Sequence, residues 1–86
     1  MKIALPSQLR SYTAQAPEVE AEGATLDALF TDLDRRFPGF RFRVINEQDQ
    51  FREHIKVFVN QEKTRSLDTP LQPQDHVLLI CAISGG

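Results

Sequence analysis

Runs of apolar residues, alternating in some places and continuous in others, predict the strands of this chain. Residues 2–5 form a short apolar stretch that a proline ends, which favours a first strand. Residues 18–21 alternate polar and apolar side chains, as half-buried strands do. Residues 55–59 and 77–81 are rich in apolar and β-branched residues and predict two stronger strands. Residues 63–65 are a candidate short edge strand after a turn.

A spacing of three and four residues between apolar side chains predicts one amphipathic helix. Its apolar stripe consists of Leu26, Leu29, Phe30, Leu33 and Phe37. Thr25 is a suitable N-cap, because its hydroxyl oxygen can accept a hydrogen bond from an early N–H of the helix. An aspartate in the first turn and two arginines in the last suit the helix dipole, and Pro38 and Gly39 end the helix.

Residues 40–53 leave two interpretations open. Apolar residues at 40, 42 and 44 alternate with Arg41 and Arg43, which fits a strand. The same residues could also form a short helical turn after Gly39. Residues 46–50 are a polar connection under either interpretation.

The predicted order is strand, strand, helix, strand, a short optional strand, and strand. Residues 1–21 therefore form a hairpin with a loose connection. Four or five strands and one main helix can bury one face of a mixed sheet beneath that helix. The prediction is an α+β protein of the β-grasp type, in which the first and last strands are central.

Composition and length narrow the classes of function. A chain of 86 residues holds one domain, and a net charge of −2 does not favour binding to nucleic acid. No apolar run reaches the roughly 20 residues that a membrane span needs, and the first residues lack the pattern of a signal peptide. The single cysteine, Cys81, cannot form an internal disulfide. We therefore expect a cytoplasmic protein without a nucleic-acid or membrane partner.

No constellation of residues typical of an enzyme is present. Paired carboxylates, a nucleophile with a base and a glycine-rich phosphate loop are all missing. His54 and His76 have no cysteine or histidine neighbours at the spacing of metal ligands, so no metal site is predicted. Cys81 shares the inward parity of its strand and is interpreted as a small core residue.

The charged residues near the main helix are interpreted as solvated. Asp27, Asp32 and Asp34 lie beside arginines on the helix and predict an exposed charged face. The arginines at 35, 36, 41 and 43 are assigned to helix capping and solvation, in preference to a basic rim for an acidic partner.

A family-like pattern extends over nearly the whole chain. Its segments are Lys2-Ile3-Ala4-Leu5, Gly23-Ala24-Thr25-Leu26, Phe37-Pro38-Gly39, Val57-Phe58-Val59-Asn60, Leu67-Asp68-Thr69-Pro70-Leu71, Asp75-His76-Val77 and Ser84-Gly85-Gly86. In this order they resemble the ubiquitin-like sulfur carriers of the MoaD/ThiS family. Residues 5–10 and the long middle segment, residues 40–54, look most like the branch that works with cysteine-synthase-like enzymes.

The resemblance implies that the C-terminus is the site of chemistry. An E1-like adenylating enzyme would use ATP to activate the carboxylate of Gly86, and sulfide or a persulfide would then displace AMP and leave a thiocarboxylate. The carrier binds no cofactor itself and would give its sulfur to a biosynthetic enzyme for cysteine, a thiolated metabolite or a sulfur-containing cofactor. Gly85 lacks a Cβ and would let the tail pass through a narrow channel. Residues 1–82 would be the β-grasp domain and residues 83–86 a flexible tail.

Strand parity predicts a docking surface for these partners. If Val57, Val77 and Leu79 face the helix, their neighbours on the two strands face away from it. The resulting exposed apolar patch consists of Phe58, Leu78 and Ile80, and such patches commonly mark interaction sites. Ile83 and Ser84, in the tail, are assigned to the same partner. The alternative is that residues 40–53 fold over this face and cover it.

Two other functions are compatible with the same sequence. The first is a ubiquitin-like modifier that is joined through Gly86 to lysines of target proteins. The second is a non-covalent β-grasp interaction module whose two terminal glycines are an inert, frayed end.

Overall fold

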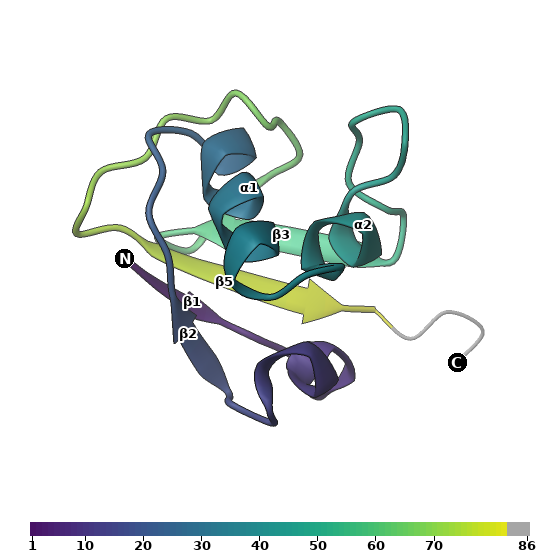
Figure 1. The fold of residues 1–86 in the computed structure, drawn as a ribbon. Helices are drawn as coiled ribbons and strands as arrows, with labels where there is room; N and C mark the ends of the chain where they lie inside the picture. The colour runs from purple at the N-terminus through teal and green to yellow at the C-terminus, as the bar shows by residue number, and fades with distance from the viewer. Residues whose placement is uncertain (83–86) are drawn as a thin grey trace.

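Five strands form one mixed sheet, and two helices pack on one of its faces in this computed structural model, which describes residues 1–82 (Figure 1). The strands are β1 (Lys2–Ala4), β2 (Glu18–Glu20), β3 (Ile55–Val59), β4 (Glu62–Thr64) and β5 (His76–Cys81). Their order in the sheet is β2-β1-β5-β3-β4. β1 and β5 run parallel and the other neighbours run antiparallel. The predicted mixed sheet, with the last strand at its centre and the first strand beside it, is confirmed.

The main helix, α1 (Leu26–Arg36), forms where the apolar spacing predicted it. Thr25 is its N-cap, and the hydroxyl oxygen of this residue accepts a hydrogen bond from the N–H of Ala28 at 3.2 Å. The apolar stripe of α1 is buried against the inward side chains of the sheet. The buried residues that meet there include Leu26, Leu29, Phe30, Leu33, Ile3, Val57, Val77 and Leu79. This layer of helix on sheet is the core of the protein.

Residues 40–44 are helical, so the strand interpretation of this segment is wrong. The short helix α2 (Phe40–Val44) buries Phe40 and Val44, which are four residues apart and therefore on one side of a helix. Gly39 precedes it with a φ of +93°, a value that glycine adopts readily. A carboxylate oxygen of Asp34 accepts hydrogen bonds from the backbone N–H groups of Gly39 and Arg41. This contact with α1 fixes where α2 begins.

The connection between β1 and β2 is more ordered than the sequence suggested. It contains a 3-10 helix, η1 (Ser7–Thr13), which buries Leu9 and Thr13. The Thr13 hydroxyl donates to the carbonyl oxygens of Arg10 and Ala16, at 3.2 and 3.1 Å. The prediction of a loose connection is therefore wrong, because the buried Thr13 side chain holds the connection together through hydrogen bonds to its backbone.

Asp32 is not the solvated helix residue that its position in the sequence suggested. Its side chain is only 13% exposed and forms ion pairs with Arg35 and Arg36. It also accepts a hydrogen bond from the backbone N–H of Glu22, which lies before the helix, at 2.9 Å. That backbone hydrogen bond, followed by the two arginines, lowers the pKa of Asp32 from 3.8 to about 2. Asp32 thus ties the β2–α1 loop to the helix.

Candidate functional site

The sheet face that points away from the helices, called the outer face below, carries the apolar patch predicted from parity. One row of residues in register crosses all five strands, in the order Glu18, Ala4, Leu78, Phe58, Lys63. Such cross-strand partners have their side chains on the same side of a sheet. The residues between them along the strands, such as Ile3, Val57, Val77 and Leu79, are buried on the opposite side. The parity argument from the sequence is confirmed.

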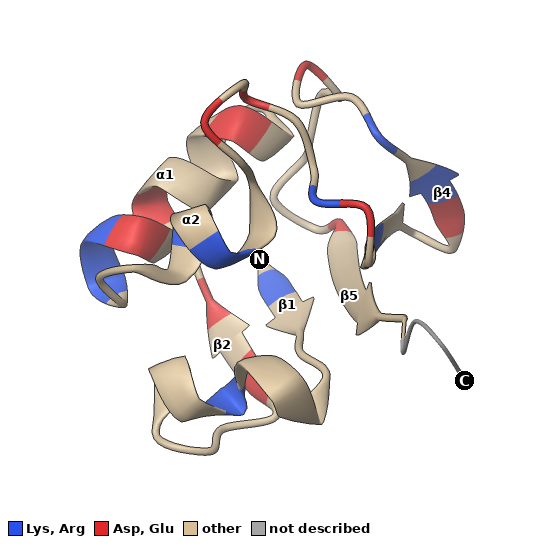
Figure 2. Cartoon of the chain, turned by 90° about the vertical axis from the view of Figure 1, so that its right-hand side faces the viewer, with Lys and Arg blue, Asp and Glu red and all other residues tan. Residues whose placement is uncertain are grey.

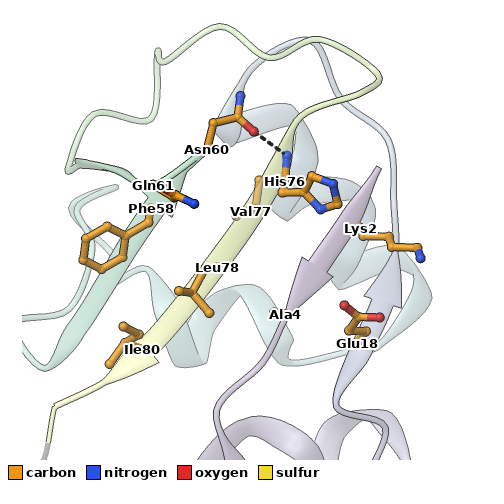
Figure 3. A pocket seen from close by; sticks show the side chains of 10 residues that line it. All are labelled: Lys2, Ala4, Glu18, Phe58, Asn60, Gln61, His76, Val77, Leu78 and Ile80. Carbon is orange, nitrogen blue, oxygen red and sulfur yellow. Dashed lines mark hydrogen bonds between the residues drawn. The ribbon is translucent and has the colours of Figure 1, made fainter.

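The centre of the outer face is apolar and accessible. Leu78 is 41% exposed and Ile80 is 40% exposed, while Phe58 is half-buried between its neighbours. The three side chains lie side by side on β3 and β5 (Figure 3). Large aliphatic side chains with this exposure are a cost in water unless another molecule covers them.

The segment of residues 40–53 does not cover the outer face. Its apolar residues belong to the helix-side core, where Phe40, Val44, Ile45 and Phe51 are buried. Figure 1 shows α2 beside α1, on the helix side of the sheet. The alternative in which this segment hides the patch is therefore wrong.

A groove of about 850 Å³ runs along the outer face. Its apolar residues include Ala4, Phe58, Leu78 and Ile80 (Figure 3). Lys2 and Glu18 line it on β1 and β2, and Asn60, Gln61 and His76 form its polar end. The groove is open to solvent. It suits a protein surface more than a small ligand, because ligand sites generally enclose most of their ligand.

The polar end of the groove is held by hydrogen bonds around Asp75. The carboxylate accepts hydrogen bonds from the Gln72 N–H and from the Asn60 side-chain amide, each at 2.8 Å. These bonds, the first of them most strongly, lower the pKa of Asp75. The Asn60 side-chain oxygen accepts in turn from the His76 N–H at 2.9 Å. The β3–β4 turn is thereby fixed to the start of β5.

The chain leaves the sheet at the end of β5, next to the apolar patch. The Ala82 N–H donates to the His54 carbonyl oxygen at 2.7 Å, and Cys81 is in register with Ile55. Cys81 is half-buried and packs against the core, as the sequence predicted for a small core residue. The remaining predicted site residues, Ile83, Ser84, Gly85 and Gly86, lie outside the described residues, so their roles stay predictions.

Two further findings concern residues 1–82. They contain no group of three or more histidine, cysteine or acidic side chains placed to hold a metal ion. Within the same range, no helix has both the length and the apolar character needed to cross a membrane.

The sequence and the fold are similar to those of known proteins. The sequence model of the ThiS family matches residues 3–86. The chain belongs to the ThiS family. It is 29% identical to the sulfur carrier protein CysO of Mycobacterium tuberculosis (strain H37Rv), over 98% of this chain and 96% of that protein. This ThiS-family chain is therefore similar to sulfur carrier proteins, which are small carriers rather than enzymes.

Solved structures show the same fold. A chain in the crystal structure of the Amycolatopsis orientalis BexX/CysO complex matches with a TM-score of 0.90 and 28% identity, over 99% of this chain and 98% of that one. SAMP1 from Haloferax volcanii matches with a TM-score of 0.79 and 25% identity, over 100% of this chain and 98% of that one. The ubiquitin-like β-grasp fold predicted from the sequence is confirmed.

Several residues of the outer face were not among the predicted site residues. Ala4 extends the apolar patch onto β1, and Glu18, Lys2 and Lys63 surround it. For Glu18, Lys2 and Ala4, the alternation of polar and apolar residues along the two strands already indicated which side of the sheet each side chain faces. What was missing was the register between strands, which places residues from distant parts of the chain in one row.

Proposed function

We propose that this ThiS-family protein carries sulfur as a thiocarboxylate on Gly86, formed after adenylation by an E1-like enzyme that docks on the outer face. The observation that supports the proposal most is an open apolar patch next to the strand from which the C-terminal segment leaves. A partner seated on Leu78 and Ile80 would have the chain end within reach.

The proposed chemistry activates a poor electrophile. The Gly86 carboxylate attacks the α-phosphorus of ATP, pyrophosphate leaves, and an acyl-adenylate remains. Hydrosulfide then adds to the carbonyl carbon, the bond to the phosphate oxygen breaks, and AMP leaves as the thiol proton is released. If the donor is an enzyme persulfide, a thiol reductant cleaves the resulting acyl disulfide to the same thiocarboxylate. The enzyme supplies ATP binding, and this chain supplies the carboxylate.

The thiocarboxylate would then pass its sulfur to a biosynthetic enzyme. The resemblance of residues 5–10 and 40–54 to the branch that works with cysteine-synthase-like enzymes favours an acceptor that makes cysteine or a thiolated metabolite. A sulfur-containing cofactor is the other destination compatible with the family.

Intact-mass spectrometry tests the proposal. The chain is co-expressed with an E1-like adenylating enzyme from the same genome, and we expect a species in which one oxygen is replaced by sulfur. The species should be absent when Gly86 is replaced by a bulky residue, as in Gly86→Trp. An unmodified mass, obtained with an enzyme that demonstrably releases pyrophosphate when mixed with this chain, would contradict the thiocarboxylate.

A second candidate function is supported by the similarity to SAMP1. Small archaeal modifier protein 1 is the name of that relative in full, and a modifier would use the same activated Gly86 to acylate lysines of target proteins. Adducts linked by isopeptide bonds that vanish when Gly85 and Gly86 are deleted would favour it. An interaction module would instead keep its partner and its activity after that deletion.

A further inference from the structure

All three lysines of the chain lie on the outer face. β-Strand register places each of them beside a residue of that face: the partners of Lys2, Lys56 and Lys63 are His76, Ile80 and Phe58, respectively. The other faces carry no lysine at all. If lysine served only general solvation, the exposed helices and loops would be expected to carry some as well.

The arginines have a different distribution and a different use. Six of the seven donate hydrogen bonds or form ion pairs within the fold: Arg10 to Leu5, Arg35 and Arg36 to Asp32, Arg41 to Asp27, Arg52 to Phe42, and Arg65 to Phe51 and Ile55. Their planar guanidinium groups suit such fixed contacts. Of the three lysines, Lys56 has one long hydrogen bond within the fold, from its Nζ to the Glu53 carbonyl oxygen at 3.4 Å. The contacts that fix the fold through positive charge are thus mainly those of the arginines.

Negative charge lies at the margin opposite Lys56 and Lys63, where Lys2 on β1 is in register with one of the two glutamates, Glu20. Glu18 and Glu20 are on β2, at one edge of the sheet, whereas Lys63 is on β4, at the other edge (Figure 2). Glu18 and Lys63 end the same row of residues, four strand spacings or about 19 Å apart. That separation exceeds the Debye length of about 8 Å, so the two charges do not neutralise each other. Among the ion pairs of residues 1–82, none includes Glu18, Lys56 or Lys63.

We propose that this order of charges determines how the activating enzyme sits on the outer face. The enzyme presents carboxylates to Lys56 and Lys63 and a cation to Glu18, on either side of the apolar contact. Lysine suits this margin because its long stem can lie over apolar surface while the ammonium stays in water. The inference rests on the proposed function and adds the charge pattern of the partner.

The unequal charge of the two margins of the outer face would affect how the enzyme is oriented relative to the C-terminus. A partner turned by half a revolution would bring like charges together, and such contacts are unfavourable. Lys56 is in register with Ile80, one residue before the last residue of β5. The charge of Lys56 therefore lies near the end of β5. We expect it to favour the orientation of the enzyme in which the chain that follows β5 points toward the bound ATP.

Charge reversal on the outer face tests the inference. The rate of pyrophosphate release is measured against carrier concentration, with the adenylating enzyme that modifies the wild-type chain. Lys63→Glu, Lys56→Glu and Glu18→Lys should each raise KM roughly five-fold at low ionic strength, the upper range for an exposed charge pair. The effect should fade at about 1 M salt, where the Debye length is about 3 Å. Lys63→Arg keeps the charge and should keep the activity.

Two exposed charges away from the outer face provide matched controls. Arg43→Glu on α2 and Glu47→Lys in the following loop make the same changes of charge, and we expect KM to stay within about two-fold of wild type. Thermal unfolding confirms that each variant is folded. If Lys63→Glu and Arg43→Glu behave alike while the wild type is adenylated, the charge pattern has no such role and the proposed function stands. If no adenylation of the wild type occurs, both proposals are wrong.

Discussion

At the scale of single residues, Gly23 shows how close approach, rather than an unusual φ, can require glycine. A Cβ at this position would lie 2.7 Å from the Leu29 Cα and 2.8 Å from the Ala28 carbonyl carbon. Both are backbone atoms of α1, so they cannot move without displacing the helix. We expect Gly23→Ala to lower the free energy of unfolding by about 1–3 kcal/mol. Chemical denaturation measures this, and Ala24→Ser at the exposed neighbour should change the value by less than about 0.5 kcal/mol.

The carboxylate of Asp32 makes stability depend on pH in the acid range. Its pKa is about 2 in the folded chain and 3.8 without these contacts. Because the folded-state pKa is the lower one, its contribution to stability is complete above about pH 5 and is lost as the pH falls toward 2. Asp32→Asn should be less stable than wild type at neutral pH, and the difference should shrink between pH 4 and about 2. Denaturation at several pH values measures it, and a difference that stays constant down to pH 2 would contradict the role of this carboxylate.

At the scale of elements, neighbouring residues of β5 face opposite sides of the sheet, so a role in stability and the proposed role in docking can be tested separately. Leu79 is 1% exposed and faces the helices, whereas Leu78 is 41% exposed and faces outward. Leu79→Ala should cost about 2–5 kcal/mol of stability, as deletions in a packed core do. Leu78→Ala should cost less than about 1 kcal/mol and should instead slow adenylation. Denaturation curves and pyrophosphate release separate the two effects, and equal losses of stability would contradict the assignment of faces.

The helix pair α1 and α2 explains why the outer face stays open. Residues 40–44 form a helix because Asp34 and Gly39 fix its start, and this helix packs beside α1. Its apolar residues Phe40 and Val44 are buried in the core. The remaining apolar residue of this helix, Phe42, is 60% exposed on the helix side of the sheet, so it does not cover the outer face.

At the scale of the whole molecule, the sheet divides two tasks between its faces. The inner face and the helices hold the buried residues and most of the contacts of the arginines. The outer face holds an apolar patch, all the lysines and two glutamates, and these residues contribute little to the core. Substitutions on the outer face can therefore test the proposed docking without unfolding this small domain.

Much of the fold and part of the site could be predicted from the sequence. Strand alternation identified Phe58, Leu78 and Ile80 as outward residues, and the register of β3 and β5 brings them together. Thr25 and the apolar spacing after it predicted α1 within one residue at its C-terminal end. These predictions succeeded because each depends on residues that are near one another in sequence, where periodicity carries the information.

The predictions that failed depended on contacts between distant residues. The helical form of residues 40–44 depends on a carboxylate in the preceding helix, and the low pKa of Asp32 depends first on the backbone of Glu22. A short segment that alternates apolar and charged residues fits both a strand and a helical turn until such contacts choose between them. The 3-10 helix η1 was missed because its seven residues carry no strong period.

By itself, the sequence determined the order of elements, the parity of the two central strands and the glycines at the chain end, because all three are local properties. Only the tertiary structure decided which face residues 40–53 cover and which charges share the outer face. Glu18 and Lys63 are 45 positions apart in the chain and belong to one row through the register of five strands. Hydrogen bonding between strands sets that register, and no single segment of the sequence contains it.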